Sequence, residues 1–386
     1  MEFYGYRRPD GRVGVRNKVL ILPASVCASD TTRIIAQQVT GSVTFNNQQG
    51  CAQVAPDQQL TMDVMAGYAA NPNIYGTVVV SLGCENCQMD LVVDAIRQRT
   101  NKPLKQVIIQ ESGGTLKAID KAVRYAKEMV EEASLLQKEK FPISELILGT
   151  ECGGSDPTSA LAANVLIGQL SDLLVQAGAT SILSETTEFI GAEHILARRA
   201  ATPEVRDRIF EIVHRYEKAL QMVGEEVRKG NPSPGNKAGG ITTLEEKSLG
   251  CIHKGGHSPV MEVYDYAKQV EAKKGLVIMD TPGHDPSSVA AMVAGGAQVV
   301  VFSSGRGTPT GNPIAPVIKI TGNRITYANM IDNIDVDASP LIYGGDLKEM
   351  GDELLKLLVE VASGKQTKAE SLGYTEMAIA RACNYV

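Results

Sequence analysis

The sequence predicts an α/β protein made of two Rossmann-like units that pack together, each with a parallel sheet, and an active site at the carboxyl ends of the strands. Short runs of continuous apolar, β-branched residues alternate with amphipathic helical stretches, as in sheets covered by helices on both faces. The chain has 386 residues, which is longer than one typical domain. Trp is absent and Phe is rare, so the core is expected to consist of aliphatic side chains.

The expected elements follow one another in a regular order. Strands are predicted at residues 18–25, 75–83, 105–112, 145–153, 180–188, 275–283 and 297–307. Helices are predicted at residues 56–70, 89–100, 114–140, 159–178 and 207–229. The long third helix should end at Phe141-Pro142, because proline cannot continue a helix. We therefore expect an N-terminal α/β domain over residues 1–141 and a C-terminal one over 142–386.

Residues 231–257 form the most informative stretch of the second domain. The segment is rich in glycine, has no apolar period, and interleaves charged side chains with a thiol and imidazoles. We expect a long loop, because nothing in the pattern favours a helix or a strand. Long loops inside compact domains are usually functional or disordered, and the mixture of reactive groups favours a functional loop.

Composition excludes several classes of protein. The formal net charge is −6 and the pI is near 5.6, so there is no basic surface for nucleic acid. No apolar run is long enough for a membrane span, and the N-terminus lacks the core of a signal peptide. We therefore expect a cytoplasmic protein whose seven cysteines are thiols.

Reactive side chains gather where the predicted strands end. Ligands of parallel α/β folds bind beyond the carboxyl ends of strands. Five cysteines lie in such turns or in the 231–257 segment, namely Cys27, Cys51, Cys84, Cys152 and Cys251. Each alone could be a small core residue. Together with neighbouring carboxylates they favour a catalytic metal held by several loops. The lone CxxC at 84–87 does not support a structural zinc site.

Two glycine turns and several arginines suggest anion binding. Gly114 and Thr115 begin one predicted helix and Ser155 lies just before another, where backbone amides can bind carboxylate or phosphate or simply be capped. Neither turn matches a nucleotide fingerprint. Arg306 lies between two glycines, and Arg12 lies in a glycine-containing basic turn near the N-terminus. A guanidinium in such a turn suits recognition of a carboxylate.

Several long motifs resemble one known family. They are GYRRPDGRVGVRN (5–17), GCE (83–85), CGGSD (152–156), SETTEFIGAE (184–193), PGNKAGGITTLEEKSLG (234–250), MDTPG (279–283) and SGRG (304–307). Together they resemble the altronate/galactarate dehydratase family, from Gly5 to about Asp337. The resemblance implies the large subunit or C-terminal catalytic part of a lyase that removes water from sugar acids. A close relative, the large subunit of sulfolactate sulfo-lyase, releases sulfite instead.

The resemblance also implies a cofactor and a partner. Fe²⁺ is the expected metal, Mn²⁺ is possible, and a [4Fe–4S] cluster ranks lower because the cysteine spacing matches no local cluster motif. The expected partner is a small subunit of the antifreeze-like (SAF) type, and the enzyme is expected to be a homo-oligomer. The alternative from another class is a non-catalytic scaffold that only positions this small subunit.

Elimination from a hydroxy acid needs a clamp, a base and an acid. Arg306 and Arg12 are predicted to bind the carboxylate, with Ser155, Gly114 and Thr115 as further substrate contacts. Lys247 or Lys237 is predicted to be the base if burial lowers its pKa. Glu185 or Glu188 would protonate the leaving hydroxyl, and Glu246 lies on the same segment as the lysines. The hypothetical metal ligands are Cys51, Cys84, Glu85, Cys152 and Asp156.

Overall fold

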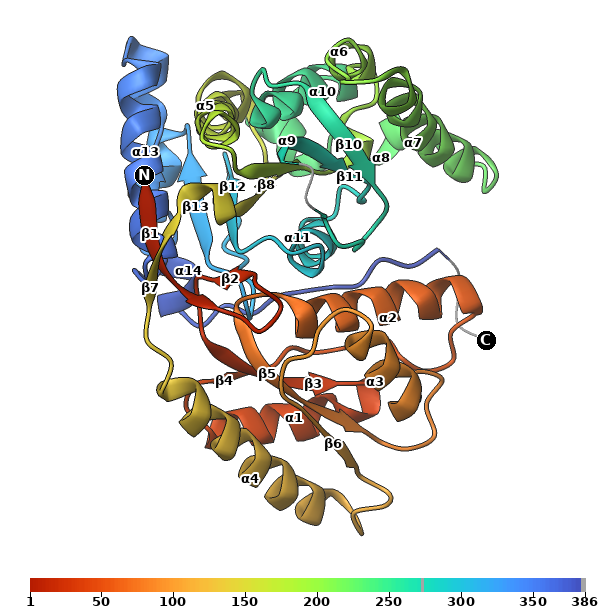
Figure 1. The fold of residues 1–386 in the computed structure, drawn as a ribbon. Helices are drawn as coiled ribbons and strands as arrows, with labels where there is room; N and C mark the ends of the chain where they lie inside the picture. The colour runs from red at the N-terminus through yellow and green to blue at the C-terminus, as the bar shows by residue number, and fades with distance from the viewer. Residues whose placement is uncertain (272–273, 383–386) are drawn as a thin grey trace.

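The computed structural model describes residues 1–271 and 274–382, and it divides this part of the chain between two parallel sheets (Figure 1). Residues 272–273 and 383–386, which belong to the predicted second domain, lie outside the described residues. The two sheets with their helices confirm the predicted α/β architecture. The position of a domain boundary at 141/142 stays a prediction.

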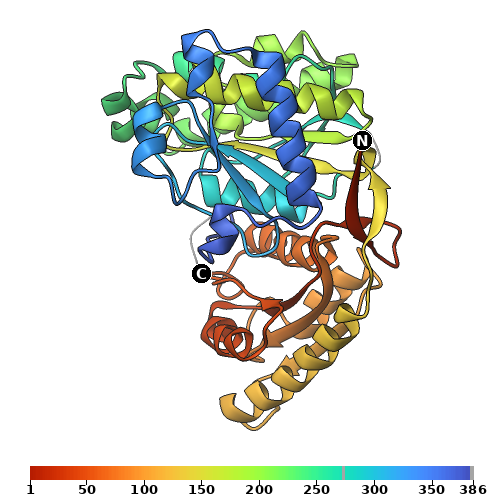
Figure 2. The same ribbon diagram turned by 90° about the vertical axis from the view of Figure 1, so that its left-hand side faces the viewer.

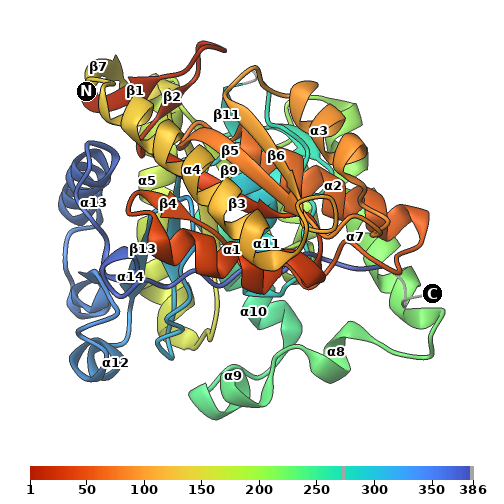
Figure 3. The same ribbon diagram turned by 90° about the horizontal axis from the view of Figure 1, so that it is seen from below.

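The first unit has a four-stranded parallel sheet with the order β4-β3-β5-β6. Its strands are β3 (Lys18–Pro23), β4 (Ser42–Val43), β5 (Ile74–Ser81) and β6 (Leu104–Ile108). Its helices are α1 (Val26–Gln38), α2 (Ala55–Ala70), α3 (Met89–Arg97) and α4 (Thr115–Ser134). Helices α1 and α4 pack together on the outer face, and α2 packs with α3 on the other (Figure 3).

The second unit has a seven-stranded parallel sheet with the order β10-β11-β9-β8-β12-β13-β14. Its strands are β8 (Ile147–Cys152), β9 (Thr180–Leu183), β10 (Val260–Tyr264), β11 (Gly275–Met279), β12 (Val299–Ser303), β13 (Val317–Thr321) and β14 (Val336–Asp337). The first strand, β8, lies in the middle, and the chain builds outward from it on both sides. The order therefore reverses beside β8, which is where ligands bind in open parallel sheets.

Helices cover both faces of the second sheet. Helix α5 packs against α13 on one face, and α11 packs against β8 on the other. Figure 2 shows α13, in dark blue, on the outside of this unit. The helical elements are η1 (Ile143–Glu145), η2 (Ser159–Ala163), α5 (Asn164–Gln176), η3 (Thr186–Glu188), α6 (Glu193–Ala197), α7 (Pro203–Gln221), α8 (Val227–Gly230), α9 (Pro234–Gly239), α10 (Leu244–Cys251), η4 (Ile252–Gly255), α11 (Asp285–Ala294), α12 (Arg324–Asn329), η5 (Ser339–Tyr343), α13 (Leu347–Ala362) and α14 (Lys368–Ser371).

A small antiparallel sheet was not predicted. It joins β1 (Glu2–Arg7), β2 (Val13–Gly14) and β7 (Glu139–Pro142) in the order β2-β1-β7. The prediction of a helix as far as Lys140 is therefore wrong at its end, because α4 stops at Ser134 and residues 139–142 pair with β1. A strand this short gains its stability from its partner strand, which periodicity within the segment cannot reveal.

The 231–257 segment is also not the loop that was predicted. It contains α9, α10 and η4, and every residue in it is described. Ser233 and Asn236 form a capping box at the start of α9, and the Thr243 hydroxyl accepts a hydrogen bond from the Glu246 amide at the start of α10. Such caps satisfy the free amides of a first turn, so short helices can form despite the glycines.

The two units share one hydrophobic cluster. It runs from Leu22 and Met65 in the first unit to Met279 and Phe302 in the second, and α2 and α11 pack against each other within it. No described helix has the length and apolar character needed to cross a membrane.

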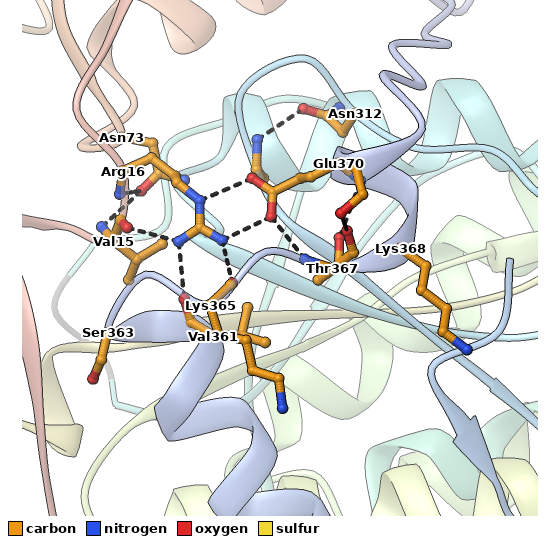
Figure 4. A network of polar contacts seen from close by, with 12 residues as sticks. Val15, Arg16, Asn73, Asn312, Val361, Ser363, Lys365, Thr367, Lys368 and Glu370 are labelled. Carbon is orange, nitrogen blue, oxygen red and sulfur yellow. Dashed lines mark hydrogen bonds and ion pairs between the residues drawn. The ribbon is translucent and has the colours of Figure 1, made fainter. Parts of the chain in front are cut away.

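A polar joint reinforces this packing (Figure 4). The Arg16 guanidinium, which follows β2, binds both carboxylate oxygens of Glu370 on α14, at 2.8 and 2.7 Å. It also donates to the carbonyl oxygens of Val361 and Lys365. The C-terminal segment then continues to α2, where the Ala382 amide donates to Asp57 Oδ1 at 2.6 Å.

Candidate active site

A cavity of about 690 Å³ lies at the carboxyl edge of the second sheet. The loops after β8, β9 and β11 form its floor, and α8, α9 and α10 form its outer wall. The side chains from the floor include Cys152, Glu188 and Asp285, while Lys247 comes from the outer wall. These are the loops in which the sequence placed its reactive residues.

Two groups of potential ligands lie behind this cavity and share Glu185. In the first group, atoms of Cys152, Glu185, Glu188 and Cys251 all lie within 4.8 Å of one another, and all four residues are buried. In the second group, oxygens of Glu151, Glu185 and Asp285 meet the same limit. The described part of the chain thus contains a buried Cys/Glu cluster that could hold a metal ion.

Lys254 lies inside the first group and is fully buried. Its ammonium lies 3.0 Å from Cys152 Sγ and forms an ion pair with Glu185. Burial alone would lower the pKa of Lys254, but the charges of Cys152, Cys251 and the glutamates outweigh burial and raise that pKa. The buried ion pair with Glu185 holds Lys254 in its ammonium form. Hydrogen bonding to Cys251, together with burial, raises the pKa of the Cys152 thiol.

Lys247 and Glu188 form an ion pair at the cavity wall. Lys247 also donates to Asn231 Oδ1 at 3.0 Å. Burial opposes both charges, but the mutual attraction outweighs it, so the pKa of Lys247 is raised and that of Glu188 is lowered. The condition under which Lys247 was predicted to be the base, a pKa lowered by burial, is not met, because Glu188 lies against it.

The carboxylates of the second group are only partly satisfied. Glu151 Oε2 accepts hydrogen bonds from Ser288 at 2.7 Å and Ser184 at 3.1 Å. Within the described residues, Glu151 Oε1 and Glu185 Oε1 are buried without a hydrogen-bond partner. Burial raises the pKa of Glu185 to about 7 and that of Asp285 to about 6, and it raises the pKa of Glu151 further above the usual range.

The backbone brings these groups together by unusual local conformations. Glu185 has a φ of 73°, a left-handed conformation that a glutamate rarely adopts, and its amide donates to Thr281 Oγ1 at 2.8 Å. Gly153 approaches Asp285 so closely that a Cβ on it would lie 1.8 Å from Asp285 Oδ2. A strained backbone and a close approach of this kind are typical of functional sites, where they hold reactive groups in a fixed geometry.

The structure brings together part of the predicted set. Cys152, Glu188 and Lys247 line the cavity, Glu185 lies with Cys152 and Glu188 in the buried group behind it, and the buried Ser155 lies against the same loop. Arg306 is exposed, although its backbone amide donates to the Gly154 carbonyl at the cavity floor. The catalytic and binding roles of all the residues in this set stay predictions.

The other predicted residues lie elsewhere or have other partners. Cys51, Cys84, Glu85, Gly114, Thr115 and Arg12 all precede the second sheet in the chain. Glu85 accepts the Leu82 and Gly83 amides, and Arg12 pairs with Asp10. Asp156 accepts from Thr158, Ser159 and Asn323. Lys237 is exposed on α9, and Glu246 binds back to Thr242. Of the predicted ligands, the two groups among the described residues contain only Cys152.

Four groups of the site were not among the predicted catalytic residues, substrate contacts or metal ligands, although Cys251 was one of the five cysteines considered for the metal. They are Glu151, Cys251, Lys254 and Asp285. Three of them lie directly beside residues that the sequence did single out, at a strand end or on the 231–257 segment. Glu151 is the second-last residue of the buried strand β8, directly before Cys152. Its alternate position in that strand was the signal that could have indicated it as a site residue.

Fold and site together define an α/β protein with a buried carboxylate–thiol–lysine centre beneath a cavity at the strand ends, which suits proton transfer and charge stabilisation. The chain belongs to the D-galactarate/altronate dehydratase family. The model of the family's C-terminal domain matches residues 143–384, and that of its second domain, described as D-galactarate dehydratase/altronate hydrolase, matches residues 5–134. This membership confirms the resemblance and the prediction of a lyase.

Curated relatives match nearly the whole chain. Altronate dehydratase of Bacillus subtilis is 37% identical over 98% of this chain and 77% of its own length. The (2R)-sulfolactate sulfo-lyase subunit beta of Chromohalobacter salexigens is 37% identical over 98% of this chain and 97% of its own length. Galactarate dehydratase of Escherichia coli is 34% identical over 94% of this chain and 73% of its own length.

Proposed function

We propose that this protein is a metal-dependent lyase that eliminates water from a sugar acid or a related 2-hydroxy carboxylate in the 690 Å³ cavity. The Lys247–Glu188 ion pair on the cavity wall carries the proposal, because it places an ammonium and a carboxylate beside a group of potential metal ligands. An elimination needs both a proton acceptor and a proton donor at such a place.

The residues fit a divalent cation. Two buried carboxylate oxygens without a partner, on Glu151 and Glu185, are costly unless something positive binds them. A divalent cation at this place would stabilise the negative charge that develops on the substrate carboxylate as the α proton leaves. We propose Fe²⁺, with Mn²⁺ as the alternative. A [4Fe–4S] cluster is less suitable, since the first group offers two thiols and cluster binding takes three or four.

We propose that Glu188 accepts the α proton and Lys247 protonates the leaving hydroxyl. The lowered pKa of Glu188 keeps it ionised, and the raised pKa of Lys247 keeps it protonated. This reverses the roles suggested by the sequence, because the ion pair fixes the charge of both groups. Arg306 is proposed to bind the substrate carboxylate, since its loop contacts the cavity floor at Gly154.

Sulfite elimination from sulfolactate is the second candidate. The identity to the sulfo-lyase subunit equals the identity to the B. subtilis altronate dehydratase, at 37%. Because that relative is a subunit, we also propose a small partner subunit of the SAF type and a homo-oligomeric enzyme.

The test is an anaerobic assay with Fe²⁺ or Mn²⁺ and a candidate small subunit. Altronate, galactarate and sulfolactate would each be supplied, and a 2-keto acid or sulfite should appear from one of them. Lys247→Met should lower kcat by at least about 100-fold, as loss of a general acid does. Lys218→Met, at an exposed position on α7, is the matched control. Absence of turnover on a broad panel of hydroxy acids would favour the scaffold alternative.

A further inference from the structure

The two ligand groups beneath the cavity differ in chemistry although they share Glu185. The first contains two thiols and two carboxylates, and the second contains carboxylates only. A single cation near Glu185 could be held by either group. The choice determines which metals the protein binds, because thiolates favour soft ions and carboxylates favour hard ions.

The thiol group already contains its own positive charges. The Lys254 ammonium lies 3.0 Å from Cys152 Sγ and pairs with Glu185, and Lys247 pairs with Glu188. Lys254 is fully buried, so its ammonium cannot move into solvent unless the surrounding residues open. A second cation at the same place would meet an ammonium at close range and would be repelled.

Of the carboxylate group as the structure describes it, only Glu185, which both groups share, is paired with an ammonium, that of Lys254, whereas in the thiol group Cys152, Glu185 and Glu188 each contact one. Among the described residues, no lysine or arginine forms an ion pair with Glu151 or Asp285. Glu151 is completely buried, and within the described part of the chain it accepts hydrogen bonds from the hydroxyls of Ser184 and Ser288, both on Oε2. The buried Lys319 forms no ion pair with these described carboxylates, but the charges of Asp285 and Glu151 act on it, and its ammonium lies 3.3 Å from the Phe302 ring centre. In the part of the chain that the structure describes, the group therefore has two buried oxygens without a hydrogen-bond partner, Glu151 Oε1 and Glu185 Oε1.

We propose that the divalent cation of this lyase lies among the carboxylate oxygens of Glu151, Glu185 and Asp285, and that Lys254 is a built-in cation that occupies the thiol side. The inference rests on the proposed function and identifies its metal site. It predicts a hard or borderline ion such as Mg²⁺, Mn²⁺ or Fe²⁺. It also predicts that Cys152 and Cys251 are not ligands.

The position of Asp285 agrees with this assignment. Asp285 lies at the cavity floor and is only partly buried, whereas Glu151 lies fully inside. A cation held between them would have protein oxygens behind it and the cavity in front. Three protein ligands leave coordination positions for water or for a substrate carboxylate, as catalytic metal sites require.

The first experiment measures Mn²⁺ binding to metal-free protein by the loss of the free-ion electron paramagnetic resonance signal. Asp285→Asn and Glu151→Gln should each weaken binding by at least about tenfold, as loss of metal-site groups does. Cys152→Ser and Cys251→Ser should bind Mn²⁺ with an affinity within about threefold of that of the parent protein, a smaller change than the loss of a metal-site group causes. Glu128→Gln, an exposed carboxylate on α4, is the matched control. Loss of Mn²⁺ binding in the serine variants with retention in the carboxylate variants would overturn the proposal.

The second experiment uses Co²⁺, whose bonds to thiolates give charge-transfer absorption. The parent protein loaded with Co²⁺ should lack that absorption, and Lys254→Met should acquire it because the thiol side is then free. Thiolate absorption in the parent protein, or none in Lys254→Met, would contradict the role of Lys254. If Glu151→Gln does not fold, Asp285→Asn remains decisive, since its side chain is only partly buried.

Both measurements are independent of turnover. A protein that binds Mn²⁺ through Glu151 and Asp285 but converts no hydroxy acid would refute the proposed function and leave the metal site standing. A protein that turns over substrate but binds Mn²⁺ equally well without these carboxylates would refute the metal site alone.

Discussion

At the scale of single residues, the close approach of Gly153 and Asp285 shows how the site depends on the absence of a side chain. A Cβ at Gly153 would lie 1.8 Å from Asp285 Oδ2 and 2.8 Å from the Phe302 ring. Phe302 is buried in the core, so Asp285 is the group that would have to move. The CGGSD motif was interpreted as an anion-binding turn, whereas its first glycine makes room for a carboxylate.

We therefore predict that Gly153→Ala lowers kcat/KM by about 100-fold, as a shift of about 1 Å in a catalytic group does. It should also weaken Mn²⁺ binding. Steady-state kinetics and thermal unfolding would check this. Gly235→Ala is the matched control, because its Cβ would meet nothing closer than 3.9 Å. Unchanged kinetics in Gly153→Ala would show that Asp285 can be displaced without consequence.

At the scale of elements, α9 and α10 are short helices that depend on their caps and on contacts with the sheet. Asn236 on α9 donates to the Ser155 carbonyl at 2.8 Å, and Asn164 on α5 donates to the Gly250 carbonyl at 3.0 Å. Isolated helices of this length are not stable in water. The segment therefore folds because the second unit holds it, and it brings Lys247, Cys251 and Lys254 to the site.

We predict that Thr243→Ala lowers the free energy of unfolding by about 1 kcal/mol, the usual cost of removing an N-cap. Its hydroxyl accepts the Glu246 amide at 3.1 Å, and alanine cannot replace that bond. Chemical denaturation would measure the change. Thr375→Ala, at an exposed position, is the control. Equal stability of the two variants would mean that contacts with the sheet alone hold α10.

At the scale of the whole molecule, a shared hydrophobic cluster and the Arg16–Glu370 joint connect the two units. Both side chains of that pair are 10% exposed. Burial acts to raise the pKa of Glu370, but Arg16 and Lys18 outweigh it and lower that pKa. A lowered carboxyl pKa contributes stability above the ordinary glutamate value, and this contribution is lost as pH falls through the folded value.

We predict that Glu370→Gln destabilises the protein by about 3 kcal/mol at pH 7, since it leaves Arg16 buried without its partner. The difference in the free energy of unfolding between this variant and the parent protein should become smaller as the pH falls below about 4.3, the ordinary glutamate pKa. Denaturation at several pH values would measure it. Glu360→Gln removes an exposed pair with Lys365 and should change stability by less than about 1 kcal/mol. A difference in the free energy of unfolding that does not depend on pH would contradict the role of the Glu370 charge.

Much of the fold was predictable because its signals are local. The seven predicted strands all exist, and the five predicted helical stretches overlap α2, α3, α4, α5 and α7. Among the described residues, β1, β2, β4, β7, β10, β13 and β14 were not among the seven predicted strands. Strands β2, β4 and β14 have only two residues each, and β7 and β10 lie at sheet edges, where pairing rather than apolar content stabilises a strand. Strand β13 lies inside the second sheet and was missed outright. Of the candidate site, the sequence indicated Cys152, Glu185, Glu188 and Lys247 by their strand ends and motifs.

The sequence by itself determined the α/β class, the family and the edge of the sheet where the candidate site lies. These follow from periodicity, motifs and the rule that parallel strands end at a common edge. Only the tertiary structure decided which strand ends meet. The order of strands puts β8 between β9 and β12, so Glu151, Glu185 and Asp285 converge while Cys51 and Cys84 belong to the other sheet's loops. The tertiary structure also decided the charge state of Lys247, because its pKa depends on contact with Glu188. Glu188 lies 59 positions away along the chain, so no local pattern could assign it as the partner.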